Sequence, residues 1–120
     1  MKDLLPLVRS YIKNSSTVLD DLQSIILPEN TLLFSADAKS MYTNIDSLHG
    51  IEVISLWLED YALEIPPDFP TLLFQKILQV VMTHNVFQLD DTFWLQTSGT
   101  SMGTSCACAY ATLYWGYIER

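Results

Sequence analysis

Two long segments of this chain carry almost no charge, and they constrain the fold more than any other feature. Residues 71–85 read TLLFQKILQVVMTHN, in which Lys76 is the only residue charged at neutral pH. Apolar residues occupy most sides of a helix with this sequence, so we expect it to be covered on both flanks. Residues 105–119 read SCACAYATLYWGYIE, with no charged residue before Glu119, and predict a second apolar helix. The fold has to supply apolar neighbours for both.

The composition sets limits on the class of protein and on its partners. The chain has 120 residues, enough for one domain or for part of a larger one. Hydrophobic residues make up 49% and charged residues only 17%, below the usual quarter, so some apolar surface is expected to meet a partner or more of the same polypeptide. Taken alone, the net charge of −8 argues against a phosphate-binding surface, which normally needs a basic stripe, and suits a metal-carboxylate site or a solvated acidic face.

The remaining segments predict further helices, one strand and a hairpin. Residues 14–27, NSSTVLDDLQSIIL, predict a helix that Ser15 or Ser16 caps and Pro28 ends. Thr31 to Asp37, TLLFSAD, predicts a buried strand. A helix capped by Asp46 should run through Tyr61 with one buried stripe, which consists of Ile51, Ile54, Trp57, Leu58 and Tyr61.

The second half of the chain has equally clear boundaries. In the loop EIPPDFP, Asp68 is the expected cap of helix 71–85, with Pro70 in its first turn. The runs VFQL and TFWLQ flank Asp90-Asp91 and predict a tight hairpin. The three tryptophans are expected in the core. The predicted fold class is therefore α+β: helix-rich, with a small antiparallel sheet that is incomplete.

The cysteines, histidines and N-terminal residues suggest ordinary structural roles. Cys106 and Cys108 are too close in a helix to bridge and have no other Cys or His nearby, so we expect buried free thiols and no zinc. His49 and His84 have no evident partner. The first residues, MKDLLPLVRSYIK, are broken by Pro6 and Arg9, so neither a signal peptide nor a membrane anchor is expected. We expect an intracellular protein with no membrane partner.

The segment DAKSMYTNI, residues 37–45, places one carboxylate directly after the predicted strand. A buried carboxylate is costly unless a metal, a cation or a turn compensates it. The small residues Ala38 and Ser40 leave backbone N–H groups open to phosphate oxygens, and Tyr42 could present its ring to a sugar. Alternatively Asp37 caps a turn and Tyr42 belongs to the core. Taken alone, the spacing favours that alternative.

The segment QTSGTSMGTSCA, residues 96–107, predicts a tight loop that leads into the last helix. Gly99 and Gly103 allow the backbone to approach a base pair or a phosphate closely. The loop has no P-loop lysine and no GxGxxG spacing, which excludes either type of mononucleotide site. A plain loop-to-helix turn explains the same residues, and taken alone it is the better explanation.

The order and separation of these two segments resemble the reverse transcriptase domain, and most closely that of Penelope-like retroelements. Their sequences are similar to D-V-K-S-L-Y-T-N-I and G-T-A-M-G-T, beside DAKSMYTNI and GTSMGT here. The resemblance runs from about Ser10 to Arg120. It implies the incomplete fingers and palm of a right-hand polymerase, with residues 1–30 as the lead-in and residues 31–120 as the palm.

The resemblance implies a role for each matching position. Asp37 matches the first catalytic aspartate, a ligand of two Mg²⁺ ions that activate the primer 3′-hydroxyl and stabilise the leaving pyrophosphate. Tyr42 matches the aromatic residue under the sugar, which favours deoxynucleotides. The other residues implied to bind the nucleotide are Ala38, Lys39, Ser40, Met41, Met102 and Gly103. Those implied to contact template or primer are Gly99, Thr100, Ser101 and Thr104.

The chain also departs from the family. Members often have Ala-Pro after the glycine loop, where this chain has Ser105 to Cys108. The third palm motif, an aromatic-x-Asp-Asp hairpin, and the thumb are absent, and Asp90-Asp91 cannot replace the motif because they precede the glycine loop.

The resemblance thus implies a fragment of an RNA-directed DNA polymerase, inactive alone, whose partners in the complete enzyme are an RNA template, a DNA primer, dNTPs and the missing palm and thumb. A nuclear location follows from the same resemblance. Two alternatives remain. The chain is a catalytically inactive remnant of a reverse transcriptase that acts as a protein-interaction module, or it is an unrelated acidic helical binding domain.

Overall fold

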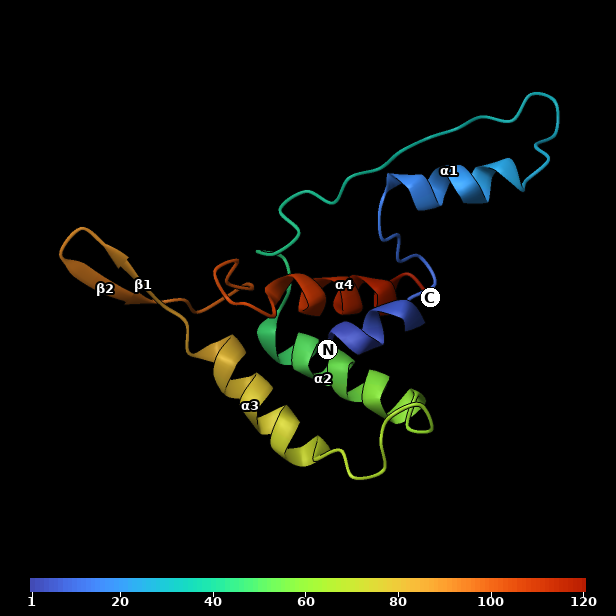
Figure 1. The fold of residues 1–120 in the computed structure, drawn as a ribbon. Helices are drawn as coiled ribbons and strands as arrows, with labels where there is room; N and C mark the ends of the chain where they lie inside the picture. Colours follow the sequence, from blue (N-terminus) through green and yellow to red (C-terminus); the bar gives the residue numbers. More distant parts are fainter.

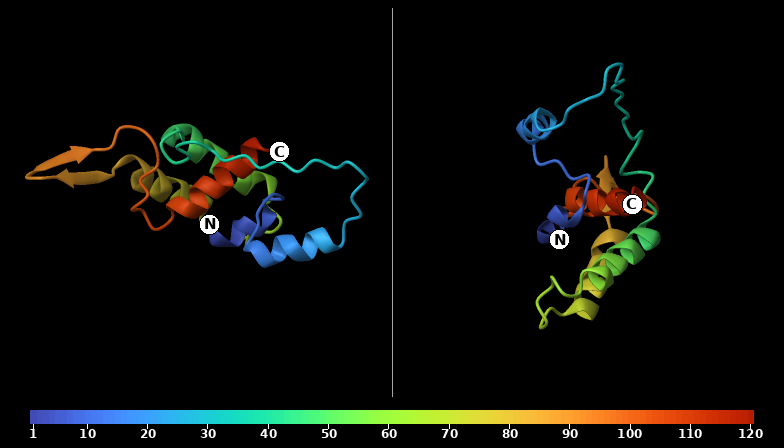
Figure 2. Two further views of the ribbon diagram at one scale, coloured as in Figure 1. Left: turned by 90° about the horizontal axis from the view of Figure 1, so that it is seen from above. Right: turned by 90° about the vertical axis from the view of Figure 1, so that its right-hand side faces the viewer.

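A computed structural model describes residues 1–120, and its core is built from three helices and one short 3₁₀ helix (Figure 1). The order is η1 (Lys2–Leu7), α1 (Ser15–Gln23), α2 (Ser47–Asp60), α3 (Thr71–Thr83), β1 (Val86–Leu89), β2 (Thr92–Leu95) and α4 (Ala107–Ile118). Helix α2 contacts both α3 and α4, and η1 packs on α4. Helix α1 and the β1–β2 hairpin extend away from this core on different sides (Figure 2). With 45% helix and 7% strand, the chain is α+β, as predicted.

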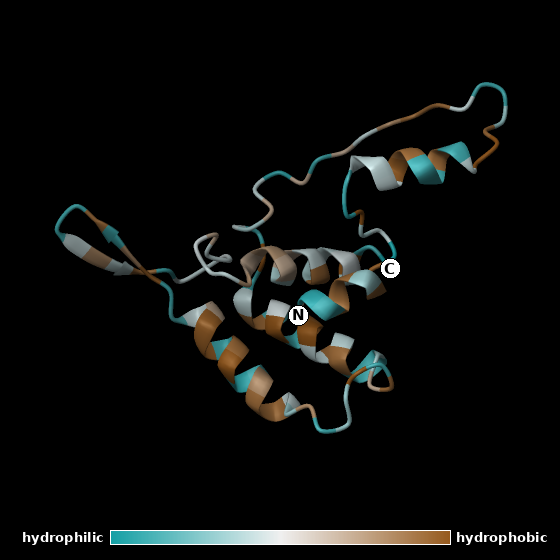
Figure 3. Ribbon diagram, viewed as in Figure 1, coloured by the Kyte–Doolittle hydropathy of each residue, from teal (hydrophilic) through white to brown (hydrophobic).

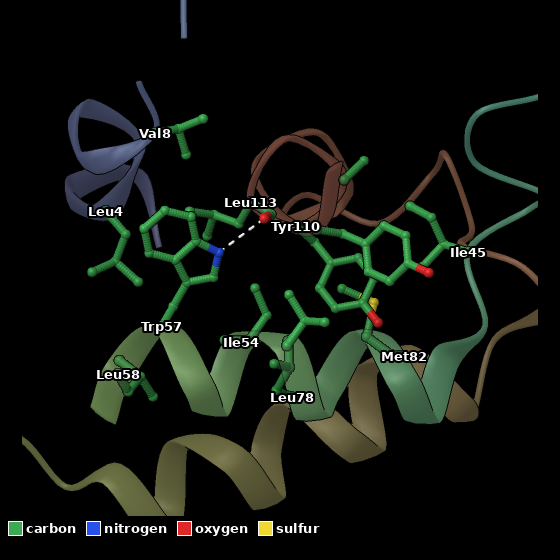
Figure 4. Packing of buried hydrophobic residues seen from close by; sticks show 13 residues of the cluster. Leu4, Val8, Ile45, Ile54, Trp57, Leu58, Leu78, Met82, Tyr110 and Leu113 are labelled. Carbon is green, nitrogen blue, oxygen red and sulfur yellow. Dashed lines mark hydrogen bonds between the residues drawn. The ribbon is translucent and has the colours of Figure 1, made fainter. Parts of the chain in front are cut away.

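The contact between α2 and α4 forms the centre of the core (Figure 4). The Trp57 indole Nε1 donates a hydrogen bond to the Leu113 carbonyl at 2.9 Å, and both side chains are buried. One turn from the start of α2, the Tyr110 ring lies on Gly50, where a Cβ would collide with the phenol oxygen. The Tyr110 hydroxyl donates to the Ser47 carbonyl at 3.1 Å. Burial raises the pKa of Tyr110 far above its usual value, so this donor stays protonated.

The N-terminal residues close the core from the other side of α4. Leu4 and Val8 are buried, and Val8 packs against Gly116, where a Cβ would collide with the valine methyl groups. The first residues are therefore part of the core, which was not predicted from the sequence.

Several sequence predictions are confirmed. Asp46 caps α2, because its carboxylate accepts a hydrogen bond from the His49 backbone N–H at 2.8 Å. The predicted stripe of α2 faces the core, with Ile54, Trp57 and Leu58 buried. The hairpin forms around Asp90-Asp91, with Val86 paired to Leu95. Both cysteines are free.

The predicted strand at Thr31 to Asp37 is wrong. These residues are extended and fully exposed, with Leu32 at 91% and Phe34 at 93% exposure, and no other segment pairs with them. A strand needs a neighbour to satisfy its N–H and C=O groups, and this chain supplies none at that position.

The prediction that residues 71–85 are covered on both flanks is also wrong. Helix α3 buries only Leu78 and Met82, against α2, and its other flank faces water. Figure 3 shows this helix mostly brown, with only a few hydrophilic bands. The exposed apolar residues of α3 are Leu72, Leu73, Ile77, Val80 and Val81.

Smaller corrections concern caps and single side chains. Asn14 caps α1 instead of a serine, through a 3.0 Å bond from the Thr17 N–H, and the helix ends at Gln23 before Pro28. Helix α3 begins after Pro70 with no side-chain cap, so Asp68 is not its cap. Trp94 is exposed on the hairpin.

Cys106 is only half-buried and Cys108 is exposed, contrary to the expected buried thiols. No helix has the length and apolar character needed to cross a membrane.

We predict that Gly50→Ala destabilises the protein although alanine favours a helix. The added methyl would displace the Tyr110 ring, and overpacking of this kind costs about 1–3 kcal/mol. Urea unfolding measures the effect. Glu52→Ala, on the exposed side of the same helix, is the matched control and should leave the free energy of unfolding nearly unchanged. An equal effect of the two substitutions would contradict the packing described for α2 and α4.

Candidate functional site

The two motif segments contact each other through their backbones. The Thr100 N–H donates a hydrogen bond to the Tyr42 carbonyl at 2.8 Å. Gly99 has a φ of +77°, and a Cβ there would lie 2.9 Å from the Thr43 Cα. The Ser47 hydroxyl donates to the Gly99 carbonyl at 3.3 Å. These backbone contacts place residues 42–47 and 99–100 side by side.

The first segment is held by a local turn. The Ser40 carbonyl accepts hydrogen bonds from the Asn44 N–H at 3.1 Å and from the Thr43 hydroxyl at 2.9 Å. The Asn44 side chain donates to the Lys39 carbonyl at 3.0 Å. Ser40 itself has a φ of 54°, in the left-handed region. The fully buried Ile45 anchors the end of the turn in the core, so residues 40–45 have a fixed path.

Tyr42 lies half-buried between this turn and the start of α4. Burial raises the pKa of its phenol, and the neighbouring Cys108 thiol raises it further. The phenol is therefore neutral and able to donate a hydrogen bond. The neighbouring Met41 is half-buried and packs against the core. The contact between Tyr42 and Cys108 was not predicted, since it depends on how α4 lies against residues 40–45.

The glycine loop combines a buried anchor with an exposed tip. Thr100 is 4% exposed, and its hydroxyl has no hydrogen-bond partner. The Thr104 N–H donates to the Ser101 carbonyl at 3.1 Å, and the Thr104 hydroxyl donates to the Asn85 side chain at 3.0 Å. Met102 and Gly103 lie between these anchors and are exposed. The loop thus presents Met102 and Gly103 to solvent.

The two glycines differ in what the fold requires of them. Gly99 is buried, has a positive φ and leaves no room for a side chain beside Thr43. A Cβ on Gly103 would meet only the Ser101 hydroxyl at 3.9 Å, which is an ordinary contact. The packing of this chain therefore requires a glycine at position 99 but gives no reason for a glycine at position 103.

Asp37 lies outside this contact. It is exposed, as are Ala38, Lys39 and Ser40, so the expected burial of its carboxylate is wrong. No three His, Cys, Asp or Glu side chains come together anywhere in the structure in a way that could hold a metal ion. The residues of this chain do not fit a site for two Mg²⁺ ions, which needs several carboxylates around the metals.

Both histidines have partners that the sequence did not suggest. The His49 Nδ1 and the Tyr114 hydroxyl are 3.1 Å apart, and the two rings meet edge to face at 5.5 Å. The His84 Nδ1 lies 2.9 Å from the Thr83 hydroxyl. These contacts belong to the α2–α4 packing and to the end of α3.

Comparisons with known proteins yield no relative. No protein-family model, no curated protein and no solved structure matches this chain. The resemblance to reverse transcriptases therefore depends on the two sequence motifs alone.

We predict that alanine lowers the stability of the protein at one glycine of the loop but not at the other. Gly99→Ala should lower the free energy of unfolding by about 1–3 kcal/mol, because it combines a positive φ with a clash at Thr43. Gly103→Ala, the matched control, should be neutral or slightly stabilising. Urea unfolding of both variants checks this, and a neutral Gly99→Ala would show that the two segments do not pack as described.

Proposed function

We propose that this chain is the fingers-to-palm part of an RNA-directed DNA polymerase of the Penelope-like type. The observation that supports the proposal most strongly is the 2.8 Å hydrogen bond from Thr100 to Tyr42. The sugar and the base of an incoming nucleotide are joined, so a residue under the sugar and a loop at the new base pair have to lie close together. The resemblance assigns those roles to Tyr42 and to residues 99–104, and these residues are in contact.

The exposed tip of the loop supports the same proposal. Met102 and Gly103 are the residues that the resemblance places at the nucleotide, and both are accessible. Gly103 has space for a side chain, so the absence of one is not a requirement of the folded chain. Close approach of a nucleic acid to the backbone is a reason for a glycine at such a position.

The exposed stretch before Asp37 fits a palm that this chain does not complete. Its apolar side chains and unpaired backbone groups would pair with the part of the polypeptide that carries the aromatic-x-Asp-Asp motif and the thumb. Asp37 would then join the carboxylates of that part. A nuclear location, RNA template, DNA primer and dNTP substrates all belong to this proposal for the complete enzyme.

The second candidate function is a catalytically inactive remnant that binds another protein. The exposed apolar flank of α3 and the exposed hairpin support it, because such surfaces mark interaction sites. The two candidates make different predictions about the transcript and the activity of a longer product.

The test of the proposed function begins with the transcript beyond the codon for Arg120. Sequencing should find an open reading frame that continues into an aromatic-x-Asp-Asp motif. An immediate stop codon would contradict the polymerase proposal and favour the remnant.

The longer product should extend a DNA primer on an RNA template, whereas the 120-residue chain alone should not. In the longer product, Tyr42→Ala should raise the incorporation of ribonucleotides relative to deoxynucleotides by about tenfold or more, because the ring that would meet a 2′-hydroxyl is gone. Tyr42→Phe, which keeps the ring, is the control and should retain the preference for dNTPs. Equal selectivity in the two variants would contradict the role of Tyr42, and primer extension by the short chain would contradict its predicted inactivity.

A further inference from the structure

One unpartnered apolar surface of this chain is an arm, residues 14–34. It consists of α1 and the extended stretch that follows. Helix α1 contacts no other helix or strand and buries none of its residues (Figure 1). The arm nevertheless carries eight large apolar side chains that are exposed: Leu19, Leu22, Ile25, Ile26, Leu27, Leu32, Leu33 and Phe34. Surface of this kind is costly to leave in water.

A second unpartnered apolar surface lies on α3 and is here termed the α3 groove. Leu73, Ile77, Val80 and Val81 recur at spacings of three and four residues, so they form one exposed stripe. Beside the stripe is a hollow of about 320 Å³ between α3 and the start of α4. Most of its lining residues are apolar, Ile77 and Val81 of the stripe among them, and Lys2 lies at its edge. The groove thus offers an apolar floor for another segment.

The charges of the two surfaces are complementary. The arm contains Asp20, Asp21 and Glu29 and no basic residue. The α3 groove has Lys76 as the only charged residue of its helix and Lys2 at the hollow, and no acidic residue lines that hollow. Asp3 and Glu64 line a separate hollow near the start of α3. Complementary charge at the rim of an apolar contact favours a specific partner.

The two surfaces do not meet within one chain. Both views of Figure 2 show the arm held away from α3, and no contact joins α1 to α3. We propose that the arm of one copy docks in the α3 groove of a second copy, and that the second arm docks reciprocally to form a twofold dimer. Reciprocal exchange uses both surfaces in both chains, as a closed symmetric interface requires. The mode is an amphipathic helix in an apolar groove.

The proposed interface is large enough for a stable dimer. Stable interfaces involve roughly 20–30 residues on each side. The arm and the α3 groove together provide a set of that size from each chain. The arm does not take part in the contact between Tyr42 and Thr100. Its residues 31–34 are those that the proposed palm would cover in the complete enzyme, so the dimer is proposed for the 120-residue chain.

Sedimentation of the 120-residue protein over micromolar concentrations tests the proposal. The expected species has twice the 13.7 kDa mass of one chain. Leu22→Asp in the arm and Leu73→Asp or Ile77→Asp in the groove should each weaken dimerisation at least tenfold, because each places a carboxylate in the apolar contact. Leu63→Asp is the matched control: Leu63 is 99% exposed, lies outside both surfaces and should leave the dimer intact. Circular dichroism should show that all the variants fold.

A mixing experiment identifies the docking partner. The Leu22→Asp variant keeps a working groove, and the Ile77→Asp variant keeps a working arm, so an equimolar mixture should regain a heterodimer with one intact contact. A monomeric wild-type protein would overturn the proposal. A dimer that tolerates both substitutions, that Leu63→Asp disrupts equally, or that mixing fails to restore would overturn it as well.

Discussion

The close contact of α2 with α4 is the interaction on which the rest of the structure depends. It requires Gly50, because any side chain there would occupy the space of the Tyr110 ring. It is fixed in register by the hydrogen bond from Trp57 to the Leu113 carbonyl. The two buried donors, the indole of Trp57 and the phenol of Tyr110, both find backbone acceptors on the partner helix. Leaving such groups unpaired would be costly, so the helices have one favourable register.

This helix contact explains why the two motif segments meet. Residues 40–45 lead directly into α2, and residues 99–104 lead into α4, so the register of the helices sets the distance between the segments. The Thr100 N–H and the Tyr42 carbonyl then pair, and Gly99 fits against Thr43. A site that belongs to two distant parts of the sequence is thus positioned by the core beneath it.

The sequence predicted those parts of the fold that depend on local patterns. The cap at Asp46, the stripe with Trp57 and the hairpin around Asp90-Asp91 were predictable because their signals lie within a few residues. Thr31 to Asp37 was predicted wrongly because an apolar run shows the tendency to form a strand but not whether a partner strand is present. The prediction that both flanks of α3 are covered was wrong for the same reason: an apolar pattern does not show whether a covering segment is present.

The candidate site was predictable only in part. The resemblance to reverse transcriptases marked both segments as candidates, but the backbone hydrogen bond that joins them was not predicted from the sequence. The Gly99 contact with Thr43 and the Cys108 thiol beside Tyr42 depend on the packing of α4 against residues 40–45, and no short-range pattern encodes that packing.

Hydrogen exchange at the Thr100 backbone amide tests the central claim most directly. The account predicts that this amide is strongly protected, because it is buried and bonded to the Tyr42 carbonyl across the two segments. The exposed amide of Met102, two residues further along the same loop and at its tip, should exchange freely under the same conditions. If the Thr100 amide exchanged as fast as that of Met102, the two segments would not be held together, and the proposed site would lose its structural basis.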